Sequence, residues 1–240
     1  RALPLSYFRG LNFLLNEQPD KAIESFIEVV KVDPQTVDLH FALGSLFRRQ
    51  GETERATRMH QNLLDRPDLP PDKREMATYE LAQDFLRAGL LDRAEGLLTK
   101  LAGTPFEHAS LGHLISIYEQ EKDWPKAIDS TQRMEALAKT PYFREIAEYY
   151  CELAQAALVR RDDAQVRANL DQALATHRGC VRATLIAGDL AHAQGDTPAA
   201  IAQWQRIETQ NPAFLSLAAD RVAAAFRERR DLDQGIQIGR

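Results

Sequence analysis

The segment HFALGSLFRRQGETERATRMH, residues 40–60, places small and large residues at regular intervals. Phe47 follows Gly44 by three residues, and His60 follows Ala56 by four. Side chains three or four residues apart share one face of a helix, and Gly51 between the two pairs is typical of a helix end. The segment therefore predicts two helices joined by a short turn, with small residues where the two backbones approach each other.

The same arrangement recurs along the chain with a period of roughly 34 residues, which is the period of tetratricopeptide repeats. The small position of each second helix holds Ala22, Ala56, Ala94, Ala127, Val166 and Ala200. Twelve residues earlier, the small position of each first helix holds Gly10, Gly44, Ala82, Ile115, Ala154 and Gly188. The pattern is weakest in the fourth and fifth repeats, where Ile115 and Val166 replace small residues.

These spacings predict an all-α solenoid of antiparallel helix pairs, built from about six tetratricopeptide repeats and a truncated seventh. We predict a single superhelical domain over residues 1–240. Its repeats cover about 3–36, 37–70, 75–108, 108–141, 147–180 and 181–214, with a partial repeat over 215–240. Short insertions are expected around Pro70-Pro71 and Pro141-Tyr142. Alternating strand patterns are nearly absent.

Turn chemistry supports this register. A left-handed residue can end each first helix, and glycines stand there at Gly51, Gly89 and Gly195. Thr197 is predicted to be the N-cap of a second helix with Pro198 at its first position, and Asp123 begins another second helix in a similar way.

Composition places the chain among ordinary folded proteins. Of its 240 residues 44% are hydrophobic and 27% are charged, and the net charge is −5. A disordered tail is excluded by this balance, and a nucleic-acid partner is not predicted for an acidic chain. No run approaches the ~20 apolar residues of a membrane span. Because the chain begins without methionine and ends within a helical pattern, we expect it to be a fragment.

No catalytic or metal-binding motif is evident, so we predict a chain that is not an enzyme. The six histidines form no H-E-x-x-H motif, and His40 and His60 occupy packing positions of their repeat. Cys151 and Cys180 form no C-x-x-C pair, which predicts buried thiols in a reducing compartment. A helical solenoid instead presents an extended surface to other proteins.

The first helices line the inner groove of such a solenoid, and their groove positions predict where a partner binds. Those positions hold Tyr7, Leu11, Phe41, Arg48, Arg49, Tyr79, Gln83 and Arg87, with Leu14 beside them. Arginine and tyrosine are enriched at binding hot spots, and arginine pairs bidentately with carboxylates. The alternative is that Arg48 and Arg49 only solvate a helix end and interact with its dipole. Phe41 and Ser45 replace the lysine and asparagine clamp of chaperone-binding domains.

Four stretches in a fixed order carry a more specific signal than the repeats alone. They are GLNFLLNEQPDKAIESFIEVVKVDPQTVDLHFALGSLFRRQGETERATRMHQNLL (10–64), AGLLDRAEGLL (88–98), IYEQEKDWPKAID (117–129) and EYYCELA (148–154). Over roughly residues 5–200, this ordered set resembles the cytoplasmic domain of the lipopolysaccharide assembly protein B family.

The resemblance implies a non-enzymatic adaptor that limits lipopolysaccharide synthesis. Its implied partners are a membrane-bound AAA+ metalloprotease, the deacetylase that commits carbon to lipid A, and a membrane sensor protein of lipopolysaccharide. It implies the cytoplasmic face of the bacterial inner membrane, with an N-terminal anchor helix, and a C-terminal rubredoxin-like module holding iron or zinc. Neither segment occurs in this sequence, and no cofactor is expected within it. The alternative is a generic tetratricopeptide scaffold in another envelope-assembly or secretion complex.

Overall fold

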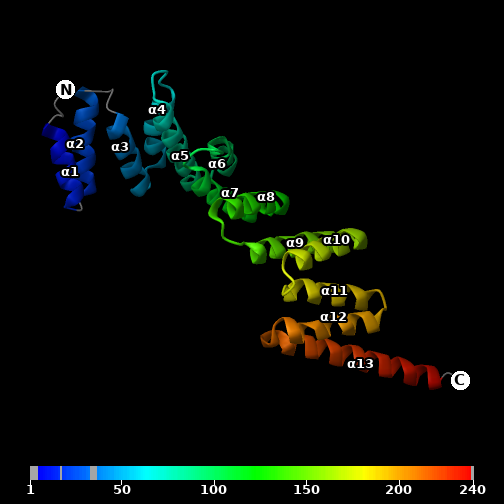
Figure 1. The fold of residues 1–240 in the computed structure, drawn as a ribbon. Helices are drawn as coiled ribbons and strands as arrows, with labels where there is room; N and C mark the ends of the chain where they lie inside the picture. Colours follow the sequence, from blue (N-terminus) through cyan, green and yellow to red (C-terminus); the bar gives the residue numbers. More distant parts are fainter. Residues whose placement is uncertain (1–4, 17, 33–36, 239–240) are drawn as a thin grey trace. The chain divides into compact units, whose positions relative to one another are not determined.

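The computed structural model describes residues 5–16, 18–32 and 37–238, and these residues form helices without a strand (Figure 1). The predicted all-α fold class is confirmed. The residues fall into two compact units, Arg1–Ile117 and Tyr118–Arg240, with the boundary inside the helix Glu107–Glu121. The single superhelical domain over 1–240 stays a prediction.

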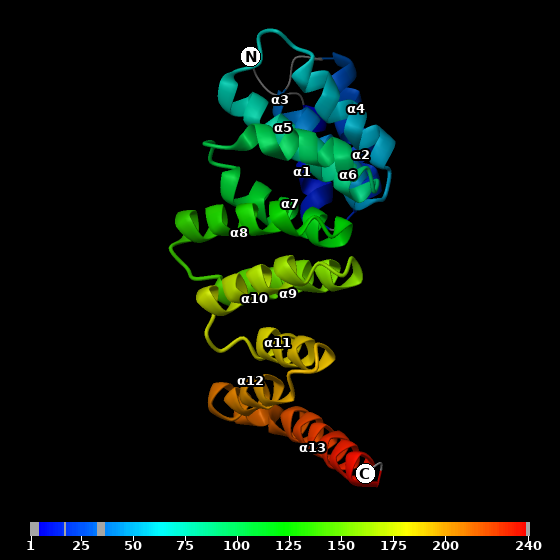
Figure 2. The same ribbon diagram turned by 90° about the vertical axis from the view of Figure 1, so that its right-hand side faces the viewer.

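The helices follow one another in pairs along each unit. The first unit contains α1 (Leu5–Leu15), α2 (Pro19–Val32), α3 (Val37–Arg49), α4 (Thr53–Leu64), α5 (Pro71–Arg87), α6 (Leu91–Leu98), the 3₁₀ turn η1 (Thr99–Leu101) and most of α7 (Glu107–Glu121). The second contains α8 (Trp124–Ala138), α9 (Phe143–Val159), α10 (Asp163–Thr176), α11 (Val181–Ala193), α12 (Thr197–Gln210), η2 (Pro212–Phe214) and α13 (Leu215–Ile238). In the second unit each helix packs on the next, from α8 to α13 (Figure 2).

Two first helices begin earlier than the repeat spacing predicts. Helix α5 starts at Pro71 and α9 at Phe143, so both first helices are 17 residues long, while Pro70 and Pro141-Tyr142 of the expected insertions precede them outside the helices. Proline suits the first turn of a helix because that turn needs no backbone N–H. One turn into α5, Arg74 donates to the carbonyls of Leu64 at 2.9 Å and Arg66 at 2.6 Å. These bonds satisfy the end of α4.

In three helix pairs a glycine of the first helix faces a ring of the second. Gly10 faces Phe26, Gly44 faces His60 and Gly188 faces Trp204, and a Cβ on any of these glycines would overlap the ring. The three rings are at most 2% exposed. Because glycine has no side chain, the helices approach closely and the ring fills the space between them. On the second helices, the small positions Ala22, Ala56, Ala94, Ala127, Val166 and Ala200 are all fully buried.

The turn inside each of the second to sixth repeats uses one left-handed residue. Three of these residues are glycines, at Gly51, Gly89 and Gly195, as predicted. Lys122 and Arg161 take the same place in the fourth and fifth repeats, with φ of 57° and 58°. An aspartate follows directly and caps the second helix at Asp123, Asp162 and Asp196. The prediction of Thr197 as N-cap is therefore wrong by one residue, because Asp196 accepts the backbone N–H of Ala199.

A basic side chain covers the aromatic ring near the end of the first helix in four repeats. Arg55 lies over Phe47 with its guanidinium carbon 4.0 Å from the ring centroid. The other pairs are Lys21 over Phe13, Arg93 over Phe85 and Lys126 over Tyr118. Each basic residue directly precedes the buried alanine of its second helix. Cation–π contact therefore adds a second link between the two helices of a pair.

We expect Gly44→Ala to lower the free energy of unfolding by about 1–3 kcal/mol, because the added Cβ overlaps the buried His60 ring. Gly96→Ala in α6 is the control, since a Cβ there meets nothing within 4 Å. That variant should be more stable by about 0.5–1 kcal/mol. Urea denaturation followed by circular dichroism measures both, and equal stability of the two variants would contradict the predicted helix contact.

We expect Arg161→Gly to raise the free energy of unfolding by about 0.5–1 kcal/mol, because relief of left-handed strain outweighs the added freedom of the unfolded chain. The neighbouring Arg160 is also exposed but has φ of −83°. Arg160→Gly should therefore destabilise the chain. Thermal melts of both variants test the assignment, and a loss of stability in Arg161→Gly would refute it.

Candidate partner-binding surface

A partly buried charge network joins α3, α4 and α5. Arg48 donates to Glu80 Oε2 at 2.5 Å and to Asp84 Oδ1 at 2.8 Å. It also donates to the backbone carbonyl of Glu80 at 3.1 Å. The second oxygen of Asp84 lies 2.5 Å from Nδ1 of His60. The four side chains tie together helices of the second and third repeats.

The network explains how an acidic residue can be buried. Asp84 is fully buried, and a buried carboxylate is tolerated only when it is paired and hydrogen-bonded. A carboxylate can only accept, so the proton between the two side chains belongs to His60 Nδ1. Nε2 of His60 faces Gly44 and has no hydrogen-bond partner among the described residues. The ring therefore serves both as packing against Gly44 and as donor to Asp84.

Arg48 is engaged within its own chain. Burial lowers the pKa of its guanidinium, but the hydrogen bonds and negative charges of Glu80 and Asp84 outweigh burial and raise the pKa. The group is charged, and its donors point to two carboxylates of α5. In this arrangement Arg48 holds α5 against α3 and has no open bidentate face for a partner's carboxylate. This differs from both sequence readings, in which Arg48 bound a partner or was solvated at a helix end.

Tyr79 belongs to an aromatic cluster between α5 and α7. Its ring stacks on Phe106 with centroids 5.1 Å apart, and its hydroxyl lies 3.2 Å from Nε2 of His113. Burial raises the pKa of Tyr79, with the charge of Glu80 adding to the effect and that of Arg48 opposing it. Burial also lowers the pKa of His113. Both groups are therefore neutral at pH 7, and Tyr79 and His113 are joined by one hydrogen bond.

The remaining predicted groove residues differ in exposure. Phe41 is 7% exposed and packs in a small core with Leu63, Leu69 and Ala77. It therefore holds α3 against its neighbours and offers little surface to a partner. Tyr7 packs against Phe26, with ring centroids 6.1 Å apart, so it belongs to the pair of α1 and α2.

Four predicted residues keep accessible surface. Leu11 on α1 is 38% exposed, and Gln83 on α5 is half-buried. Arg49 and Arg87 are exposed in the last turns of α3 and α5. Cations at these ends interact favourably with the helix dipole, and their guanidinium groups remain open to solvent. The side chain of Leu14 lies outside the described residues.

The partners of Arg48 and Tyr79 were not predicted from the sequence. Glu80 and Asp84 stand 32 and 36 residues after Arg48, and His113 stands 34 after Tyr79. A separation of about one repeat could have predicted these contacts, because it connects first helices of successive repeats. The contribution of Phe106 carries no such signal, since it precedes α7 in a loop.

The second unit has comparable polar links between its first helices. Arg182 on α11 contacts Glu148 at 3.1 Å and Glu152 at 2.6 Å, both on α9. Arg221 on α13 contacts Asp189 on α11 at 2.8 Å. These pairs are partly exposed, so each stabilises the joint by only about 0–1 kcal/mol.

Neither a membrane span nor a metal-ligand group is found in the described part of the chain. None of its helices is both long enough and apolar enough to cross a bilayer, and no three His, Cys, Asp or Glu side chains converge there. The iron or zinc implied by the family resemblance concerns a module that these 240 residues do not contain, and it stays a prediction.

Comparison with known proteins establishes the class. The tetratricopeptide repeat family matches residues 9–57 and 151–213. The crystal structure of a tetratricopeptide repeat protein from Parabacteroides merdae superimposes with a TM-score of 0.51 at 14% identity, covering 90% of this chain and 100% of that one. Together with the helix pairs, these matches show a helical tetratricopeptide-repeat fold.

The similarity to individual curated relatives is more specific than the similarity to the repeat class. Lipopolysaccharide assembly protein B of Escherichia coli K12 is 34% identical over 227 residues, which cover 94% of this chain and 58% of that protein. The protein of the same name from Haemophilus influenzae is 31% identical over 240 residues, covering 96% of this chain and 60% of the relative. The resemblance to lipopolysaccharide assembly protein B is confirmed, and the chain spans about three fifths of these relatives' length.

We expect Arg48→Ala to lower the free energy of unfolding by about 3 kcal/mol, because it leaves the buried carboxylate of Asp84 without its cationic partner. Arg49→Ala is the matched control, since its exposed side chain lies on the same helix turn. It should change stability by no more than about 0.5 kcal/mol. Chemical denaturation measures both variants, and similar losses in the two would argue against a structural network.

Proposed function

We propose that this chain is the repeat scaffold of an adaptor that regulates lipopolysaccharide synthesis. The adaptor promotes degradation of the lipid A-committing deacetylase by a membrane-bound AAA+ metalloprotease, and a membrane sensor protein of lipopolysaccharide opposes it. It acts at the cytoplasmic face of the bacterial inner membrane. The observation that supports this proposal is the similarity to lipopolysaccharide assembly protein B across 94% of the chain.

The proposed mechanism needs no chemistry from the chain itself. An adaptor accelerates proteolysis by holding the substrate near the protease, which raises the effective concentration of one protein at the other. A stack of helix pairs suits this task, because neighbouring repeats offer contact positions on a continuous scaffold.

We assign a docking surface to the first helices α3 and α5 of the first unit. Arg49, Arg87, Gln83 and Tyr79 contribute to it. Support comes from the exposure of both arginines and from the neutral aromatic cluster of Tyr79 on α5. Arginine and tyrosine give much of the binding energy at many interfaces. Arg48 and Phe41 are left out, because one is ion-paired within the chain and the other is buried.

We expect the wild-type chain to bind the purified deacetylase or the soluble part of the protease saturably in calorimetric titration. Arg49→Glu combined with Arg87→Glu should weaken that binding by about tenfold or more, since two exposed cations at the surface become anions. Circular dichroism melts verify that the double variant remains folded.

The control carries the same charge change elsewhere. Arg58 on α4 and Lys100 in η1 are exposed, and Arg58→Glu with Lys100→Glu should bind as the wild type does. Equal weakening by both double variants would indicate a non-specific charge effect and overturn the assigned surface. Absence of binding to either protein would favour the generic scaffold in another envelope complex.

A further inference from the structure

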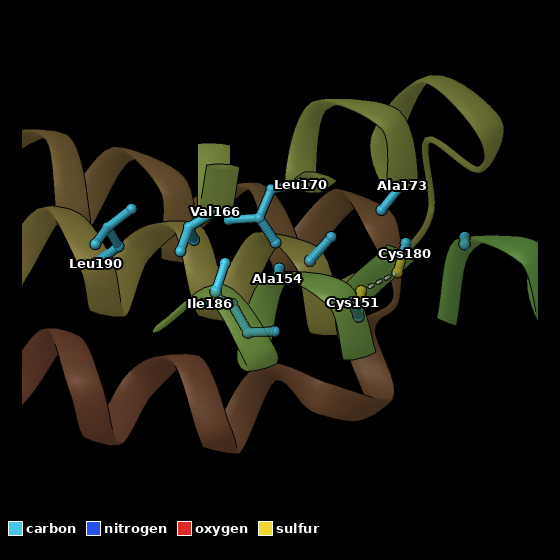
Figure 3. Close-up of a cluster of buried hydrophobic side chains, with 11 residues drawn as sticks. Cys151, Ala154, Val166, Leu170, Ala173, Cys180, Ile186 and Leu190 are labelled. Carbon is cyan, nitrogen blue, oxygen red and sulfur yellow. Dashed lines mark hydrogen bonds between the residues drawn. The ribbon is translucent and has the colours of Figure 1, made fainter. Parts of the chain in front are cut away.

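The two cysteines of the chain meet in the core of the second unit. Cys151 on α9 and Cys180, which occupies the N-cap position of α11, have their sulfur atoms 3.7 Å apart. They are separated by 29 residues in sequence. Figure 3 shows them facing each other at one end of the buried cluster that includes Ala154, Val166 and Leu170. Both are free thiols.

The two thiols have unequal chemical environments. The hydrogen bond from Cys151 lowers the pKa of Cys180 despite burial, and the backbone N–H of Ala183 contributes to this effect. The same bond, together with burial, raises the pKa of Cys151. Glu148 opposes the Cys180 thiolate, with its carboxylate oxygen 3.8 Å from the sulfur, but Arg182 is ion-paired with this carboxylate. Cys180 also occupies the N-cap position of α11, where helix N–H groups favour a thiolate, and it lines a cavity, so we take it as the nucleophilic member of the pair.

A cavity provides a route to Cys180. It has a volume of about 280 Å³ and lies between the start of α11 and the start of α13, where Cys180, Val181, Leu185, Phe214 and Leu217 line it. Cys180 itself is 3% exposed, so a small oxidant is favoured over a protein thiol as its reaction partner.

We propose that Cys151 and Cys180 are a reversible oxidation site, at which a peroxide converts the two thiols into an intrachain disulfide. The Cys180 thiolate attacks one peroxide oxygen, which forms a sulfenic acid and releases hydroxide; this hydroxide takes up the proton that Cys180 had lost. Cys151 then attacks the sulfenic sulfur, and its proton leaves with the displaced hydroxide as water. Two thiols and one hydrogen peroxide thus give one disulfide and two waters.

The bond would fasten two successive repeats to each other. Cys151 belongs to the first helix of the fifth repeat and Cys180 begins the first helix of the sixth. The ion pairs of Arg182 with Glu148 and Glu152 already cross the same joint. A covalent bond beside them restricts the unfolded chain and keeps α9 and α11 together.

The test treats the dilute full chain with hydrogen peroxide under denaturant-free conditions. We expect loss of both thiols in thiol titration, a mass lower by two hydrogen atoms, and a 151–180 cross-link in a non-reducing peptide map. Dithiothreitol should reverse all three. The oxidised chain should melt higher by about 5–10 °C.

Single variants distinguish the pair from two unrelated cysteines. In Cys151→Ala, Cys180 should form a sulfenic acid that dimedone traps, whereas in Cys180→Ala, Cys151 should react slowly. Thiols that survive peroxide in the folded wild type, independent overoxidation of the two residues, or disulfides formed only between chains would each overturn the proposal. The 151–180 cross-link in the wild-type chain tests the proposal even if a variant fails to fold.

Discussion

The close approach of paired helices, made possible where a glycine meets a ring, sets the geometry of the strongest repeats. Gly10, Gly44 and Gly188 each leave room for a buried aromatic side chain on the next helix. Where the first helix carries alanine, as at Ala82 and Ala154, the second helix carries leucine at the corresponding position. A smaller residue on one helix is thus paired with a larger residue on the other, as close packing requires. Side-chain size is adjusted pairwise while the backbone arrangement is repeated.

Polar links between repeats follow a different rule, because they connect first helices one period apart. They include Lys73 with Asp38, Arg48 with Glu80 and Asp84, Tyr79 with His113, Tyr149 with Glu119, Arg182 with Glu148 and Glu152, and Arg221 with Asp189. Most are partly exposed and add little stability. The network around Asp84 is the exception, since its acidic group is fully buried. Apolar contacts therefore form the pairs and also join neighbouring repeats, as Phe41 and Ala77 do, while polar contacts add links between successive first helices.

The helix pairs and turns that recur from repeat to repeat could be predicted from the sequence. The roles of residues that occur in only one repeat could not. Periodic small residues were enough to locate the helix pairs, the left-handed glycines and the buried ring of His60. The role of Arg48 was misjudged, because its type and place suit a partner's carboxylate as well as the buried Asp84 of its own chain. Cys151 and Cys180 gave no signal as a pair, since 29 residues separate them and only folding brings α9 to the start of α11. Periodicity alone therefore does not predict the side-chain contacts between successive repeats.

Such locality has a consequence for regulation. In a repeat protein each unit contacts only its neighbours, so a change at one joint acts mainly on the adjoining helices. The Asp84 network belongs to the first unit, and the Cys151–Cys180 pair belongs to the second. The docking surface proposed on α3 and α5 would therefore keep its shape if the joint between α9 and α11 were altered by the proposed oxidation. Separate tasks can be assigned to separate joints, which a single compact core does not allow.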